Sequence, residues 1–210
     1  MRRLVIILLI LGGILVAGDF AARAYAESRV KEVLMASLDL ERQPDVALGG
    51  ISFLFSLASG TVPSATVSAT DVTIERVPVE RMELLLQEVA FSPRELLRKS
   101  GAIHATTGDG SAVLSGEDVT AALRNNDIPV SVRFEAGRAF VSAEPLIGDV
   151  AANVSVEDGQ IVLRPDVPLL GSLISVRLPP ILPGVRYTSV TLENDQAALS
   201  FDLTDTTFEF

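Results

Sequence analysis

Residues 65–75 have the sequence Ala-Thr-Val-Ser-Ala-Thr-Asp-Val-Thr-Ile-Glu. Apolar and polar residues alternate through Ala69, and the alternation resumes at Val72 one position out of phase. Alternation with a period of two is typical of a strand that has one buried and one solvent-facing side. A change of phase by one residue indicates a β-bulge. Because bulges bend strands, the segment predicts a curved sheet.

Similar alternation recurs toward the C-terminus. The alternating segments are 130–134, 139–143, 150–156, 161–163 and 197–203. Ala136-Gly137 and Asp158-Gly159 predict turns between neighbouring strands. Gly108-Asp109-Gly110 predicts a hairpin between strands at 103–107 and 111–115. The larger part of the chain is therefore expected to form a mainly antiparallel sheet.

The segment before these strands has helical periodicity. Between Glu27 and Leu40 the apolar positions follow the spacing of one helix face, and they are Val30, Val33, Leu34 and Leu38. Gln43-Pro44 ends this predicted helix, which can continue upstream without a break. Capping signals predict two short extra helices at 93–99 and 117–124. The sequence thus predicts an α+β protein.

The N-terminus resembles a targeting or anchoring segment. Arg2 and Arg3 precede an uncharged apolar run, Leu4–Gly18, which Asp19 ends. Fifteen residues of helix cover roughly 22 Å, which is short of the ~30 Å hydrocarbon core. Ala24-Tyr25-Ala26 supplies a cleavage pattern, so a cleaved signal peptide and an uncleaved anchor both remain open. Either way residues 1–26 are the targeting segment, and residues 27–210 lie outside the cytoplasm.

Composition excludes several classes of protein. The chain has 17 Lys+Arg against 27 Asp+Glu, so its formal net charge is −10, which excludes a nucleic-acid-binding surface. Its 48% hydrophobic content and mean hydropathy of +0.40 exclude intrinsic disorder. There is no Cys and one His, and no nucleophile motif or phosphate loop occurs. We therefore expect no catalytic residues, no metal site, no cofactor and no enzymatic activity.

Two apolar stretches resemble motifs of a known family. Pro44-Asp45-Val46 with Gly50–Leu54 is similar to a Pro-x-Val-x-x-Gly-Phe-Pro-Phe-Leu-like motif, although Ile and Ser stand where Phe and Pro are usual. Leu178–Gly184 is similar to a late Leu-Pro-x-x-Pro-Gly-like motif. Over residues 27–210 the chain resembles the LmeA-like phospholipid-binding family of actinobacterial cell envelopes.

The resemblance implies a tubular-lipid-binding-like fold, in which a curved sheet wraps around the long N-terminal helix. It also implies an apolar groove between helix and sheet that holds acyl chains. The candidate groove residues are Val30, Val33, Leu34, Leu38, Phe53, Leu54, Phe55, Leu57, Leu169, Leu170, Ile174, Leu178, Ile181 and Leu182. Arg177 and Arg186 are candidates for contact with a lipid phosphate. Core packing of the aliphatic residues and solvation of the two arginines are the alternatives.

Two functions remain open. The first is a non-enzymatic phospholipid-binding protein on the outer face of the plasma membrane that supports envelope lipid or lipoglycan (lipomannan-type) assembly. Its expected partners are a phospholipid or lipid-linked envelope precursor, the plasma membrane through residues 4–22, and an envelope glycosyltransferase. The alternative is a membrane-tethered scaffold, or partner of an envelope-building enzyme, with a filled core and no lipid ligand.

Overall fold

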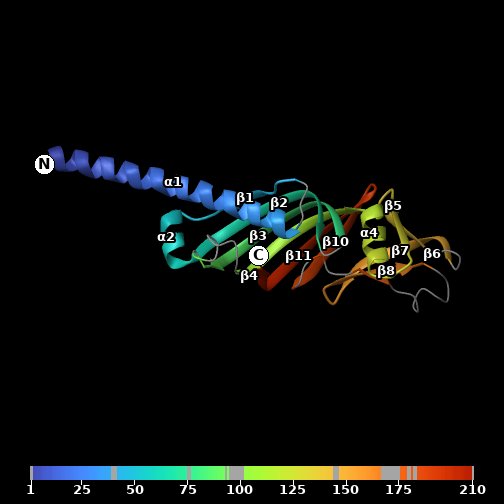
Figure 1. The fold of residues 1–210 in the computed structure, drawn as a ribbon. Coiled ribbons are helices and arrows are strands. Elements are labelled where there is room, and N and C mark those ends of the chain that lie inside the picture. Colours follow the sequence, from blue (N-terminus) through green and yellow to red (C-terminus); the bar gives the residue numbers. More distant parts are fainter. Residues whose placement is uncertain are drawn as a thin grey trace.

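The fold combines one long helix with two antiparallel sheets (Figure 1). The computed structural model describes residues 2–38, 42–74, 77–92, 94, 102–143, 147–166, 176–178, 181 and 184–209. Its helices include α1 (Arg2–Leu38), α2 (Phe53–Ser59) and α4 (Gly116–Asn125). Its strands are β1 (Asp45–Leu48), β2 (Thr61–Ile74), β3 (Val77–Phe91), β4 (Ala102–Ser115), β5 (Ser131–Glu135), β6 (Arg138–Ala143), β7 (Ile147–Glu157), β8 (Gln160–Pro165), β9 (Val176–Arg177), β10 (Val185–Glu193) and β11 (Gln196–Glu209).

The strands divide between two sheets. Sheet 1 has the order β1-β2-β3-β4-β11-β10, and sheet 2 has the order β5-β6-β7-β8-β9. Every pairing within them is antiparallel. The predicted α+β class with curved antiparallel strands is confirmed, but two sheets replace the single expected sheet. They meet where β10 contacts β7 and β8.

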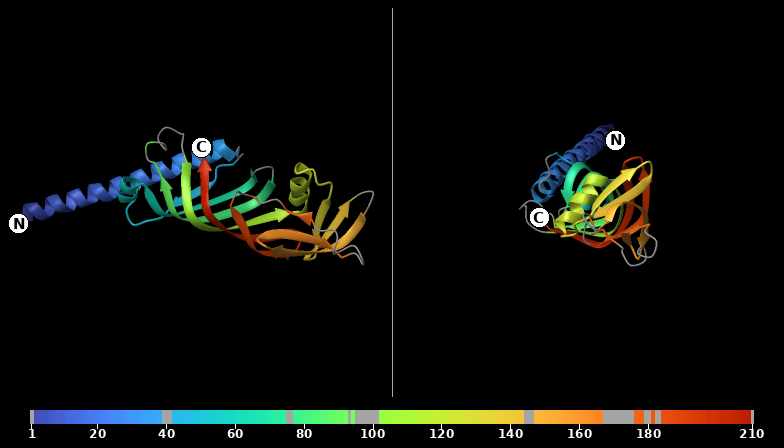
Figure 2. Two further views of the ribbon diagram at one scale, coloured as in Figure 1. Left: turned by 90° about the horizontal axis from the view of Figure 1, so that it is seen from below. Right: turned by 90° about the vertical axis from the view of Figure 1, so that its right-hand side faces the viewer.

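Helix α1 runs unbroken from the N-terminal apolar run into the predicted amphipathic helix. Its first half projects beyond the rest of the protein, and its second half lies along sheet 1 (Figures 1 and 2). The second half contacts β1, β2 and α2. Leu9–Glu32 is long and apolar enough to cross a membrane, and almost none of it is buried. A signal sequence has the same composition.

The predicted helix at 117–124 is confirmed as α4. Ser115 caps it, because its hydroxyl accepts the Asp118 N–H at 3.1 Å while the Asp118 carboxylate accepts the Ser115 N–H at 2.8 Å. This reciprocal pair satisfies two N–H groups that a helix start leaves open. The other predicted short helix, at 93–99, lies outside the described residues.

The predicted change of phase in β2 is confirmed, although its geometry is not that of a one-residue bulge. Ala69 and Val72 are both buried, and Asp71 between them has a left-handed backbone with φ 53°. Opposite, β3 also changes phase, because Val79 and Met82 are both buried. Since both strands change together, the pairing continues beyond Asp71 in the same register.

A second change of phase crosses several strands in one row. Glu88 in β3 and Asp205 in β11 both have left-handed backbones, with φ 51° and 48°. Each lies opposite Thr106 of β4, because the flanking pairs on either side are in register. L-residues other than glycine rarely adopt this conformation. The aligned positions therefore shift, by one residue, which side chains of sheet 1 point inward. The shift follows one line across the strands.

The predicted hairpin at Gly108-Asp109-Gly110 is wrong. These residues lie inside the continuous strand β4, which pairs with β3 and β11 along this stretch. A Cβ at Gly110 would lie 2.6 Å from the Phe201 ring, so the glycine admits close packing rather than a turn. The predicted turns at Gly137 and Gly159 are confirmed, and both glycines have positive φ.

Candidate functional site

The first group of predicted groove residues lies on α1. Val30 and Leu34 are partly buried and pack against the main core. The side chains of Val33 and Leu38 lie outside the described part of the chain. The amphipathic helix therefore contributes at least two of its four predicted apolar side chains to contacts with the main core.

The second group lies on α2 and does not reach the main core. Phe53 is buried with Ala26 of α1 and Val62 of β2 in a small separate cluster, and Leu57 is partly buried against it. Leu54 and Phe55 instead face solvent, with 37% and 76% of their surface exposed.

The third group follows β9. Leu178 and Ile181 are buried, with 9% and 1% exposed. Leu169, Leu170, Ile174 and Leu182 lie outside the described residues. The structure thus places the described groove residues in three locations, and Leu178 of the third lines a cavity.

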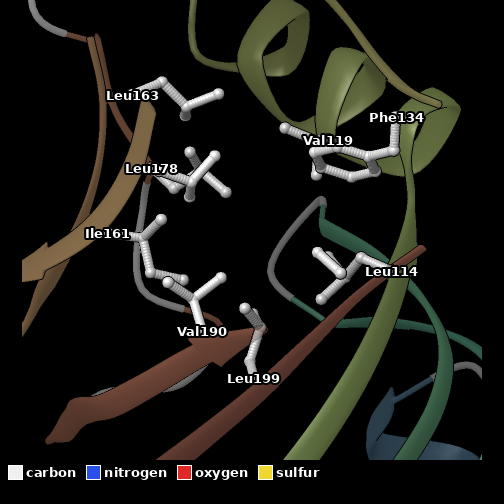
Figure 3. Close-up of a pocket in the computed structure, with 10 residues that line it drawn as sticks. Leu114, Val119, Phe134, Ile161, Leu163, Leu178, Val190 and Leu199 are labelled. Carbon is white, nitrogen blue, oxygen red and sulfur yellow. The ribbon is translucent and has the colours of Figure 1, made fainter. Parts of the chain in front are cut away.

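The cavity lies where sheet 1, sheet 2 and α4 meet (Figure 3). Its lining is wholly apolar and comes from elements far apart in the chain: Leu114, Val119, Phe134, Val154, Ile161, Leu163, Leu178, Val190, Ala197 and Leu199. Its volume is about 10 Å³. That is about the space one water molecule needs, so an acyl chain can enter only if the lining side chains separate.

One side of the cavity is nearer to solvent than the others. Val154 on β7 and Val190 on β10 are partly exposed, whereas the other lining residues are buried. These two strands belong to different sheets and contact one another at the seam. No ladder hydrogen bonds join β7 to β10 among the described pairings, and the Tyr187 N–H of β10 donates to the Gly159 carbonyl of the β7–β8 turn at 3.0 Å. Separating the two strands therefore disrupts side-chain packing and this one backbone hydrogen bond.

The segment after β9 is held against the cavity by two hydrogen bonds. The Leu178 N–H donates to the Ile161 carbonyl at 3.0 Å. The Ile181 N–H donates to the Tyr187 hydroxyl at 3.1 Å. Tyr187 is 4% exposed, and its ring meets that of Phe201 edge to face, with centroids 6.3 Å apart. Tyr187 of β10 therefore fixes the position of Ile181.

Both predicted headgroup arginines lie at the β7–β8 turn. Arg177 donates from Nη1 to the Gln160 side chain at 3.2 Å. The Arg186 side chain covers Gly159 so closely that a Cβ at position 159 would overlap it. Four other arginines pair with carboxylates: Arg29, Arg42, Arg133 and Arg164. No described carboxylate pairs with Arg177 or Arg186. Arg177 pairs with Val162, which lies on the other face of sheet 2 from the lining residues Ile161 and Leu163, so these cations lie at the rim of the seam and not inside the cavity.

Replacing Tyr187 by phenylalanine is expected to lower the free energy of unfolding by about 1–3 kcal/mol, because the buried Ile181 N–H loses its acceptor. Chemical denaturation of the full chain measures this difference. Tyr25→Phe is the matched control, since the Tyr25 side chain is 52% exposed and its hydroxyl accepts from the exposed end of the Arg29 side chain. Equal stability of the two variants would contradict a structural role for the Tyr187 hydroxyl.

The same hydroxyl makes stability depend on alkaline pH. Burial raises the pKa of Tyr187 to about 12. The folded state thus holds this proton above the ordinary pKa of ~10, at which unfolded tyrosine loses it. Stability is therefore complete below about pH 10 and falls toward pH 12, by at most ~1.4 kcal/mol per pH unit. Tyr187→Phe is expected to lack this part of the decline in melting curves recorded across that range.

Sequence reasoning missed most of the cavity lining as a site, although it placed many of these residues correctly. Val154, Ile161, Leu163, Ala197 and Leu199 belong to the predicted alternating strands. Their inward direction was readable from the alternation, but the meeting of two sheets was not. No sequence motif marks Tyr187, since its role depends on the backbone of Ile181.

Comparison of the sequence with known protein families agrees with the apolar character of this site. A family model described as LmeA-like phospholipid-binding matches residues 17–202. The chain belongs to this family. No curated protein and no solved structure matches it. Among the described residues of this LmeA-like protein, no group of three or more His, Cys, Asp or Glu side chains could hold a metal ion. Membership connects the chain with phospholipid binding, and the family is a lipid-binding family rather than a known enzyme family.

Proposed function

We propose that this LmeA-like protein is a non-enzymatic phospholipid-binding protein of the outer face of the plasma membrane. Acyl chains enter the cavity at the seam between the sheets, and the phosphate meets Arg177 and Arg186. A wholly apolar cavity at the seam, with two arginines at the nearby β7–β8 turn that pair with no described carboxylate, is the observation that carries this proposal. Each buried CH₂ group contributes about 0.8 kcal/mol, so separating the lining can be offset by a long acyl chain.

The anchor is proposed to remain uncleaved. Ala26, the residue before the possible cleavage point, is 4% exposed and packs with Phe53 and Val62. Upstream of it, Asp19 and Arg23 hydrogen-bond to the segment that carries α2. Cleavage would cut α1 within its contact with the domain. Residues 1–26 therefore act as the anchor, and residues 27–210 as the extracytoplasmic lipid-binding domain.

The physiological role we propose is support of envelope lipid or lipoglycan (lipomannan-type) assembly in an actinobacterial envelope. A lipid-linked precursor has the same chemistry as a phospholipid, namely acyl or prenyl chains and a phosphate. A glycosyltransferase that consumes such a precursor is the expected protein partner.

Photolabelling tests the lipid proposal on the full chain. The chain is reconstituted into vesicles that contain phosphatidylglycerol with a diazirine in the acyl chain, irradiated and mapped by peptide mass spectrometry. Labelled peptides from 147–166 and 184–209 are expected beside the cavity. Labelling of α1 alone reports only lipid around the anchor and would refute acyl-chain binding at the seam.

The double variant Arg177→Gln/Arg186→Gln is expected to reduce cavity labelling by phosphatidylglycerol about tenfold. Loss of charge-assisted contacts to one phosphate is worth at least the ~1.4 kcal/mol that this factor requires. Arg124→Gln/Arg138→Gln removes the same charge from exposed sites elsewhere and is expected to leave labelling unchanged. A similar loss in both double variants would mean that general attraction to the vesicle surface, not headgroup binding, was measured.

The scaffold alternative is favoured by one observation, which is the small volume of the cavity. At about 10 Å³ the seam is nearly filled by the protein's own side chains. If the chain is folded but its cavity is not labelled, this result would favour the function of a membrane-tethered scaffold without a lipid ligand.

A further inference from the structure

An apolar surface beside the anchor is unused by the lipid-binding proposal. It consists of Ile51, Leu54 and Phe55 at the start of α2, and we call it the α2 apolar surface. Ile51 is fully exposed, and Leu54 and Phe55 have 37% and 76% of their surface exposed. Large side chains with this exposure add little to the core, so their clustering on a seven-residue helix indicates an external contact.

The α2 apolar surface has a fixed place along α1. The Ser52 hydroxyl and the Leu54 N–H both donate to Oδ1 of Asp19, at 2.8 and 2.9 Å. One turn further along α1, Arg23 donates to the Gly50 carbonyl at 2.6 Å. Asp19 is the residue that ends the uncharged run of α1. In Figure 1, α2 lies beside α1 between the projecting half of that helix and the sheets.

The surroundings of this surface suit a membrane interface. No charged residue occurs between Asp45 and Asp71, so the whole α2 segment is uncharged. The two charged α1 side chains at the same level, Asp19 and Arg23, are hydrogen-bonded to this segment. Two exposed aromatic residues lie on α1 near the same level, with Phe20 at 68% and Tyr25 at 52%. Aromatic side chains favour the boundary between headgroups and acyl chains.

We propose that the α2 apolar surface inserts into the outer boundary region of the same bilayer that α1 anchors to. The proposal rests on the membrane anchoring included in the proposed function, and not on lipid binding at the seam. The run Leu4–Gly18 covers only roughly 22 Å, which is less than the ~30 Å hydrocarbon core. A second apolar element immediately after the run extends the apolar contact on one side of the helix and draws the domain against the membrane.

The absence of tryptophan from the chain allows a direct test. Phe55→Trp in the full chain, reconstituted into vesicles of phosphatidylglycerol and phosphatidylcholine, supplies a single fluorophore. Its emission is expected to shift to shorter wavelength and to be largely lost when the lipids are brominated near the glycerol end of the acyl chain. Leu85→Trp is the matched control, because Leu85 is an exposed apolar residue of β3, 39% exposed, at a position that pairs with Thr66 of β2 and Asp109 of β4. Its emission is expected to persist.

A second variant tests the surface rather than one residue. Adding Ile51→Ser and Leu54→Ser to Phe55→Trp is expected to restore most of the emission, with an unchanged circular dichroism spectrum. Membrane docking would be overturned if the chain stays with the vesicles after an alkaline wash while the fluorescence at position 55 is not quenched. A blue-shifted but unquenched signal would identify a protein occupant, such as a second copy, and would overturn it equally. Chain released by the wash would overturn the anchor, and docking with it, while leaving lipid binding at the seam to its own test.

Discussion

Replacing Phe201 by alanine is expected to lower the free energy of unfolding by about 3–5 kcal/mol, the usual range for a buried phenylalanine. Phe201 is 1% exposed, meets Tyr187 edge to face and lies against Gly110 on the neighbouring strand. The glycine has no side chain with which to fill the space, so the cavity would persist. For a chain of this length the melting temperature is expected to drop by roughly 6–20 °C.

Phe55→Ala is the control for this prediction. It removes the same side chain from a position that is 76% exposed, so stability is expected to change by less than about 0.5 kcal/mol. Calorimetry or thermal denaturation of both variants in the same detergent measures the difference. A Phe201→Ala protein as stable as wild type would mean that the inner face of sheet 1 is not a packed core.

Replacing Val190 by aspartate is expected to abolish acyl-chain binding at the seam. Val190 lines the cavity yet is partly exposed, so an aspartate carboxylate at this position can remain hydrated in the lipid-free protein. An acyl chain at the seam would strip that hydration from an unpaired charge, at a cost of several kcal/mol. Photolabelling of the β10–β11 peptides is expected to fall about 100-fold or more, since each 1.4 kcal/mol is a factor of ten.

Two comparisons make this result interpretable. Val190→Ile keeps the apolar character and is expected to preserve labelling. Labelling of α1 peptides by surrounding lipid should be equal in all variants and serves as the internal standard. If Val190→Asp melts like wild type and still labels at the seam, the acyl chains lie elsewhere.

The strand architecture was predictable because its signal is local. Ala65 to Ile74 alternate as a half-buried strand must, and the change of phase around Asp71 is visible in the letters. What the letters could not show is that β3 changes phase opposite β2. A one-residue bulge and a matched pair of changes give the same pattern in one strand, and only the partner strand distinguishes them.

The segment that became α2 was harder to assign because it is uncharged throughout and has no clear alternation of apolar and polar residues. Both ends of the helix are capped. Ser52 accepts the Phe55 N–H at the start, and Gly60, with φ 73°, donates to the Ser56 carbonyl at the end. Such caps carry little weight in a seven-residue segment, where contacts with α1 decide the outcome. The candidate site was equally hidden, because ten residues from seven strands and helices and one loop converge only after both sheets have formed.

The unbroken course of α1 limits how far this protein can reach. A helix of 37 residues is a stiff rod of about 55 Å, and it is continuous from the N-terminal apolar run to the part that lies along sheet 1. With α1 as the proposed anchor, the domain can diffuse with the membrane and rotate about the helix, but it cannot swing outward to meet a distant acceptor. Any lipid it holds must therefore be handed over close to the bilayer surface, to a partner that comes to it.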